Sequence, residues 1–124
     1  MPAGGLNTSV QDLARFPSMV FAEGKASGKP LLKPDTLHEM LRPQNGDVAL
    51  DLGLRTGLAW MLGGLGGIDI ANAGTVAHHS GATLLFHSQL IALPDHKLGV
   101  AVMANSGRSP PERCSAGMVS TTMD

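Results

Sequence analysis

The stretch Thr75-Val-Ala-His-His-Ser-Gly-Ala-Thr83 decides the fold of this chain, together with the apolar runs at residues 84–93 and 98–105 that follow it. Between the two runs, residues 93–97 (Leu-Pro-Asp-His-Lys) have the chemistry of a tight turn, because Pro presets φ and Asp accepts hydrogen bonds from the backbone beyond it. A strand, a short break, a strand, a turn and a strand predict an antiparallel meander. His79-Ser80-Gly81 ends the first strand, where polar residues meet a glycine that lets another backbone approach closely. This position predicts one wall of an active site.

The last apolar run indicates how the sheet is covered. Leu98, Val100 and Val102 alternate with residues that are also apolar, namely Gly99, Ala101 and Met103. A strand with one wet face would alternate polar with apolar residues, so we expect cover on both faces. Helices are the available cover. The sequence therefore predicts an α/β protein of the α+β type, with an antiparallel sheet covered by helices.

Two helices are expected before the sheet. Thr8 or Ser9 can cap the first helix, each with a polar partner three residues later. Pro17 interrupts the apolar spacing, which predicts a short helix to about Phe16 and a further turn or two to about Ala22.

The second helix is expected to start at Pro34, a good first helical residue, and to stop before Pro43. Residues 23–30 and 44–54 are expected to be mostly loop. Residues 57–62, a short apolar run bounded by glycines, predict a buried strand.

Composition excludes several classes of protein. Nine basic and ten acidic residues give a net charge of −1, so the chain has no excess of positive charge for binding nucleic acid. With one Trp and no Tyr, it also lacks the aromatic side chains on which bases stack. No apolar run approaches the ~20 residues that span a bilayer, so no membrane span is predicted. The lone Cys114 excludes an internal disulfide and any multi-cysteine zinc site.

His87 and His96 could be proposed as metal ligands together with the pair His78 and His79. Adjacent residues of a strand point to opposite faces, and no carboxylate or cysteine completes a known ligand spacing. The sequence therefore predicts neither a metal nor another cofactor.

The order of several segments resembles the serine β-lactamase-like superfamily, whose members include class C β-lactamases, low-molecular-weight penicillin-binding proteins, D-aminopeptidases and related esterases. The resemblance covers residues 2–105 and rests on four segments: Pro2-Ala-Gly-Gly-Leu6 with the helix up to Phe16, Gly57-Leu-Ala-Trp60 as the G-L-G-W strand, His79-Ser80-Gly81 as the third motif (K-T-G or H-x-G), and residues 90–105 as the closing hairpin. It implies a partial β-lactamase/transpeptidase-like fold and a serine hydrolase that forms an acyl-enzyme from an ester, amide or β-lactam carbonyl.

The resemblance also implies roles at the third motif. His79 would stand as a polar or cationic group beside the reacting centre, and Ser80 with Gly81 would bind the substrate. The backbone N–H of Ala82 would be one of two oxyanion donors, whose removal typically costs ~3–4 kcal/mol of barrier.

The chain departs from the family pattern in two respects. No Ser has Lys three residues later and no Tyr is present, so the S-x-x-K nucleophile and the second motif are missing. We expect them upstream of this chain, which would be a C-terminal piece that is inactive alone. Residues 1–106 are then the C-terminal part of a β-lactamase-like domain. Residues 107–124, an unpatterned tail predicted to be poorly ordered, stand where the family has a C-terminal helix.

One consequence concerns partners. Without the upstream part, the strand Leu98–Ala104 would present an unpaired edge that pairs with a complementary N-terminal segment or with a second copy. The alternative function is a non-catalytic interaction module that binds a partner through this open edge. The substrate, the compartment and the oligomeric state stay open.

Overall fold

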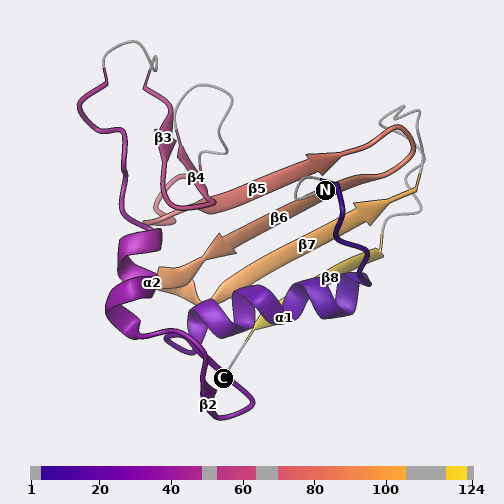
Figure 1. Ribbon diagram of the computed structural model, residues 1–124, viewed down its shortest axis with the longest axis horizontal. Helices are drawn as coiled ribbons and strands as arrows, with labels where there is room; N and C mark the ends of the chain where they lie inside the picture. Colours follow the sequence, from indigo (N-terminus) through magenta and orange to yellow (C-terminus); the bar gives the residue numbers. More distant parts are fainter. Residues whose placement is uncertain (1–3, 49–52, 64–69, 106–116, 123–124) are drawn as a thin grey trace.

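The computed structural model describes residues 4–48, 53–63, 70–105 and 117–122, the last segment as backbone (Figure 1). Two helices pack on an antiparallel sheet, which confirms the α+β class. The helices are α1 (Val10–Phe21) and α2 (Pro34–Met40), and a hairpin of β1 (Lys25–Ala26) and β2 (Lys29–Pro30) lies between them in sequence. The main sheet runs in chain order: β3 (Arg55–Thr56), β4 (Met61–Gly63), β5 (Ala77–Ala82), β6 (His87–Leu93), β7 (Leu98–Ala104) and β8 (Gly117–Thr122).

The predicted meander is confirmed as β5, β6 and β7. The turn between β6 and β7 is the 3-10 helix η2 (Pro94–His96), closed by Lys97 in the left-handed conformation. The break between β5 and β6 is longer than predicted, because Leu84, Leu85 and Phe86 form the exposed tip of the hairpin and β6 begins at His87.

Alternation along the strands separates the residues of the sheet into two faces. Ala77, Ala92 and Gly99 lie side by side on one face, to which the helices contribute apolar side chains. The main core joins residues from both helices, three strands and the turn before β4, namely Ala14, Met19, Val20, Phe21, Leu37, Trp60, Ala77, Leu90, Ala92 and Ala101. We refer to this side of the sheet as the helical face.

The opposite face is covered at one end only, within the described residues. There Ala73 and Val76 pack with Leu93, whereas Val100 and Val102 are half-buried. The prediction of helices on both faces was therefore wrong for the described chain, since both helices contribute to the core of the helical face. The apolar residues on both faces of β7 are thus explained: the helices cover the helical face, and Ala73 and Val76 with Leu93 cover one end of the opposite face.

Helix α1 begins as one of the two predicted caps requires, with the Ser9 hydroxyl accepting the Asp12 N–H at 3.1 Å. The predicted break at Pro17 was wrong, because α1 continues through it to Phe21. Proline removes one helical hydrogen bond, but the ring of Pro17 is fully buried against β7. A Cβ built on Gly99 would lie 3.1 Å from the Pro17 Cβ, so the absence of a side chain in β7 makes room for the ring.

Helix α2 begins at Pro34 as predicted. The predicted strand at residues 57–62 was wrong over its first part, since Gly57–Trp60 forms a turn between β3 and β4. Gly57 N–H donates to the Trp60 carbonyl at 2.8 Å, and Ala59 has a positive φ of 64°. The loop predicted for residues 23–30 contains the small β1–β2 hairpin, turned by Ser27 and Gly28, both with positive φ.

Strand β8 overturns the predicted open edge at Leu98–Ala104. Residues 117–122 pair with β7 from Leu98↔Thr122 to Met103↔Gly117, so both edges of β7 are occupied. These six residues lie within the segment 107–124 that was predicted as an unpatterned tail. Their Val and two Thr favour a strand once a partner edge is available. Cys114 and the rest of the predicted tail lie outside the described residues.

Among the described residues, neither helix has the length and apolar character needed to cross a lipid bilayer.

The turn at Gly57 yields a stability prediction. A Cβ on Gly57 would overlap the Met40 carbonyl oxygen, which already accepts the Leu58 N–H at 2.9 Å. We expect Gly57→Ala to lower the free energy of unfolding by roughly 1–3 kcal/mol, because backbone atoms must separate. The measurement is urea denaturation.

The matched control is Gly46→Ala, since a Cβ at Gly46 meets nothing within 4 Å. We expect a change within about 0.5 kcal/mol for this variant. Equal effects of the two substitutions would contradict the close approach of Gly57 to α2.

Candidate active site

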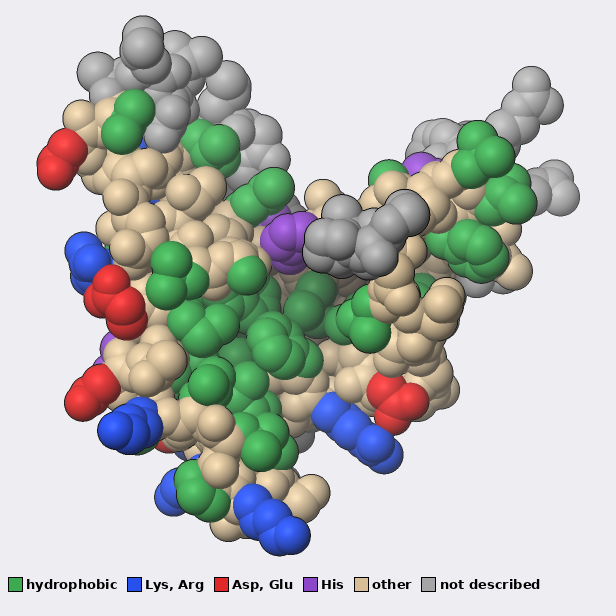
Figure 2. Space-filling model, in the orientation of Figure 1, with side chains coloured by type: hydrophobic (Ala, Val, Ile, Leu, Met, Phe, Trp, Pro, Cys, Tyr) green, Lys and Arg blue, Asp and Glu red, His purple; other side chains and the backbone are tan. Residues whose placement is uncertain are grey.

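The end of β5 that carries His79, Ser80, Gly81 and Ala82 has one free edge among the described residues. Strand β6 pairs with β5 along its whole length, whereas β4 pairs with it only at Met61↔His78 (Figure 1). In the same orientation, the molecular surface is hollowed between the β3–β4 end and the β5–β6 hairpin, and histidine surface is visible there (Figure 2). The predicted site residues therefore lie at an edge of the sheet that is unpaired among the described residues.

Hydrogen bonding at the β5–β6 hairpin determines which peptide groups of β5 point to its free edge. Thr83 N–H donates to the Phe86 carbonyl at 2.8 Å, so residues 83 and 86 form a hydrogen-bonded pair. In an antiparallel ladder such pairs alternate with pairs whose peptide groups point outward. With the observed register, Gly81 and His79 bond to β6, whereas the N–H and C=O groups of Ala82 and Ser80 point to the free edge.

The side chains of the motif separate onto two faces. His79 lies on the helical face beside Leu90, and its side chain is exposed. Ser80 lies on the opposite face beside Gln89 and is also exposed. The structure therefore does not bring the imidazole and the hydroxyl together, because they lie on opposite faces of the strand whose free edge carries the Ser80 and Ala82 peptide groups.

Gly81 lies on the helical face, where a Cβ would come 2.8 Å from the Ser88 hydroxyl oxygen. Because Gly81 has no side chain, no atoms project from this position beside the free edge.

Trp60 is a site neighbour that the sequence indicated only as a core residue. Continuing the Met61↔His78 register by one residue brings Trp60 opposite His79 on the helical face. Its ring stacks on Phe16, with centroids 5.7 Å apart and planes inclined by 21°. Trp60 is 3% exposed, and its Nε1–H has no acceptor among the described residues. Burial was predictable from the apolar run; the unsatisfied donor depends on the packing.

The remaining histidines do not join this site. His78 is buried on the face opposite to His79, and burial lowers its pKa, with the nearby His79 as a smaller cause. His87 faces the same side at the far end of β6, and the His96 ring lies 3.3 Å from the Asn72 carbonyl oxygen. Within the described ranges, no three His, Cys, Asp or Glu side chains are grouped as metal ligands would be.

The comparison with protein families agrees with this architecture. A family model described as Beta-lactamase matches residues 1–120 of the 124 residues. The chain belongs to the β-lactamase family. The resemblance drawn from the separate motifs is thereby confirmed, and with it membership of a serine hydrolase-like superfamily whose substrates are small molecules.

No curated protein matches the chain at the threshold applied. No solved structure matches it either.

The alternation at the free edge predicts a pattern of amide exchange. We expect the amide protons of Ser80 and Ala82 to exchange with solvent at least roughly tenfold faster than those of His79 and Gly81, since only the latter two bond to β6. Hydrogen–deuterium exchange followed by NMR measures this directly. Equal protection of all four amides would contradict a free edge at this end of β5.

A proline pair provides the control on stability. Ala82→Pro removes an N–H that points away from the ladder, whereas Gly81→Pro removes one that bonds to β6. We expect Gly81→Pro to cost at least about 1 kcal/mol more in the free energy of unfolding.

The buried His78 predicts a loss of stability in mild acid. Its folded-state pKa lies below the ordinary value of 6.5, so below about pH 6.5 the unfolded chain binds more protons than the folded chain. The free energy of unfolding should therefore decrease as the pH falls from 6.5 through the lowered pKa. We expect His78→Asn to flatten this decrease in urea denaturation series from pH 7.5 to pH 5.

His87→Asn is the matched control, because His87 lies on the same face but is only half-buried. Parallel pH curves for His78→Asn and the unsubstituted chain would contradict a buried, uncharged His78.

Proposed function

We propose that this chain supplies the third-motif wall of a serine hydrolase that transfers the acyl group of an ester, amide or β-lactam through an acyl-enzyme. The observation that supports it most is the outward direction of the Ala82 and Ser80 peptide groups on a strand that is otherwise paired. Family membership supports the same class of chemistry.

In this proposal the Ala82 N–H is an oxyanion donor. A carbonyl placed along the free edge would direct its oxygen at this group, which has no competing partner in the β5–β6 ladder. A fixed backbone donor needs no reorganisation when negative charge develops on that oxygen, and this is the source of its stabilising effect.

The neighbouring residues bind and orient the substrate. The Ser80 C=O and N–H can hydrogen-bond an amide-bearing substrate along the edge, and Gly81 keeps the approach open on the helical face. His79 adds a polar group on that face beside the reacting carbonyl. Ala82 and His79 are thus the proposed catalytic residues, and Ser80 and Gly81 are the proposed substrate-binding residues.

The nucleophile belongs, in this proposal, to a polypeptide other than this chain, because no Ser of the chain lies three residues before a Lys. That polypeptide would carry S-x-x-K and cover the hollow beside β5. The exposed tip at Leu84, Leu85 and Phe86, which adjoins the free edge, is apolar surface that such a partner would bury. The chain alone is then inactive.

A second candidate function is a non-catalytic interaction module. With β7 paired on both sides, such a module would bind through the free edge of β5, by addition of a partner strand. The exposed hairpin tip favours it as much as it favours a split enzyme.

The test uses the purified chain alone and together with the polypeptide encoded directly upstream of Met1. We expect no hydrolysis of nitrocefin or p-nitrophenyl acetate by the chain alone, and turnover by the complex if the upstream polypeptide carries S-x-x-K. In the active complex, Ala82→Pro should lower kcat by roughly 10²–10³-fold with a smaller change in KM. Gly46→Ala, far from the free edge in sequence and open to solvent, is the control that should keep full activity.

Two results would contradict the proposal. Turnover by the chain alone that is abolished in His79→Ala would contradict its inactivity. A stable complex with a protein that lacks S-x-x-K and shows no turnover would favour the interaction module instead.

A further inference from the structure

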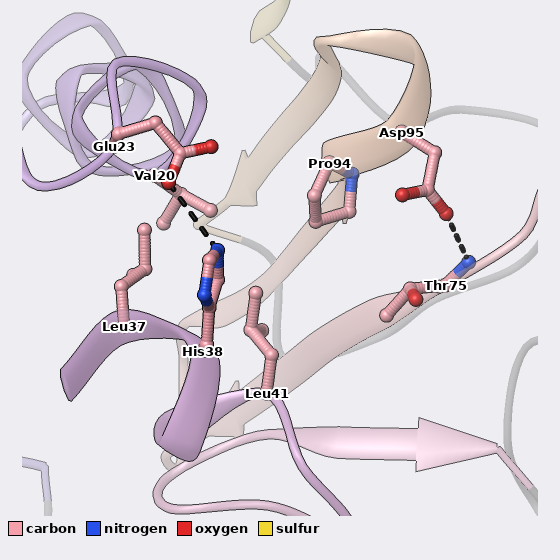
Figure 3. A pocket seen from close by; sticks show the side chains of 8 residues that line it. All are labelled: Val20, Glu23, Leu37, His38, Leu41, Thr75, Pro94 and Asp95. Carbon is pink, nitrogen blue, oxygen red and sulfur yellow. Dashed lines mark hydrogen bonds and ion pairs between the residues drawn. The ribbon is translucent and has the colours of Figure 1, made fainter. Parts of the chain in front are cut away.

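A cavity of about 290 Å³ opens at the end of the sheet where β5 begins, between the two helices and η2 (Figure 3). Its apolar side chains are Val20, Leu37, Leu41 and Pro94. Its polar lining consists of Thr75, Asp95, Glu23 and His38. No lysine or arginine of the described chain lines it, so the two carboxylates make its formal charge negative.

Asp95 is held at one wall by the backbone. Its Oδ2 accepts the Thr75 N–H at 2.8 Å, as the dashed line in Figure 3 shows. Gly74 has a positive φ of 64°, and a Cβ there would overlap the Asp95 carboxylate, so glycine is required for this approach. The second carboxylate oxygen of Asp95, Oδ1, makes no hydrogen bond within the described residues and lies on the side of Pro94 in Figure 3.

Glu23 forms the opposite wall. Its Oε2 lies 3.4 Å from the His38 Nε2, which leaves Oε1 without a partner among the described residues. The cavity therefore presents two carboxylate oxygens that only accept hydrogen bonds, one on each side of an apolar floor made by core residues. A ligand that complements it needs a positively charged donor and a short hydrocarbon body.

We propose that this cavity is a binding site for a small aliphatic ammonium compound. The ammonium group donates to Asp95 Oδ1 or to Glu23 Oε1, while the other carboxylate adds negative charge to the cavity, and the hydrocarbon body contacts Val20, Leu37, Leu41 and Pro94. The volume lies at the lower end of the ~300–1,000 Å³ of typical ligand pockets, which favours a small ligand. Both carboxylates are exposed and screened by water, so the expected Kd is on the order of 1 mM at low salt.

This site is separate from the free edge of β5. Thr75 precedes β5, whereas Ser80 and Ala82 end it, and five residues of strand span about 17 Å. The proposal therefore does not depend on the hydrolase assignment and survives if that assignment fails.

The experiment is an NMR titration of the ¹⁵N-labelled chain with butylammonium chloride at pH 8. Sodium chloride at equal ionic strength, 1-butanol and sodium butanoate are the comparison solutes. We expect saturable shifts of the Thr75, Asp95 and His38 amide signals with butylammonium alone.

Two charge-removing variants test the carboxylates, and each keeps the oxygen that serves an existing contact. Asp95→Asn retains an acceptor for the Thr75 N–H, and Glu23→Gln retains one for His38. We expect either variant to weaken butylammonium binding at least tenfold, and Asp35→Asn, an exposed charge at the start of α2 outside the cavity, to leave it unchanged.

The absence of saturable shifts would overturn the site. So would equal shifts with 1-butanol, which would indicate an apolar cavity without charge selection. Unchanged affinity in Glu23→Gln and in a folded Asp95→Asn would also overturn it, and Glu23→Gln alone decides the matter if Asp95→Asn fails to fold.

Discussion

The pairing of β5 with β6 is the constraint on which the rest of this molecule depends. One bond, from the Thr83 N–H to the Phe86 carbonyl, sets the phase of the whole ladder. That phase determines which side chains of the motif face the helices and which peptide groups face outward. A shift of one residue would turn His79 to the opposite face and direct the Ala82 N–H into the sheet, where it could contact no substrate.

The helical face holds this arrangement through one close approach. Gly99 in β7 lacks a side chain at the position where Pro17 and Phe21 of α1 pack against the sheet. The same contact explains why a proline in the middle of α1 does not end the helix, since the buried ring gains packing that offsets the missing hydrogen bond. Local helix rules and tertiary packing disagree at Pro17, and packing prevails.

The edges of β7 and β5 differ in a way that matters for function. Strand β8 pairs along β7, so the edge that local reasoning left open is occupied, whereas β4 pairs with β5 at one position and leaves the motif end accessible. An enzyme of the β-lactamase family and a strand-binding module would both use such an edge. The exposed Leu84–Phe86 tip adjoins this edge and is apolar surface that a covering polypeptide would bury.

The sequence by itself determined the meander, the turn at residues 93–97, the capped start of α1, the start of α2 at Pro34 and the family, because each depends on neighbouring residues or on a fixed order of motifs. It also identified His79, Ser80, Gly81 and Ala82 as one unit. Only the tertiary structure decided that His79 is on the face covered by the helices and that the Ser80 and Ala82 peptide groups point to a free edge. Ladder phase and edge occupancy come from hydrogen bonds between segments distant in sequence, such as β7 with β8, and no local pattern of side chains encodes them.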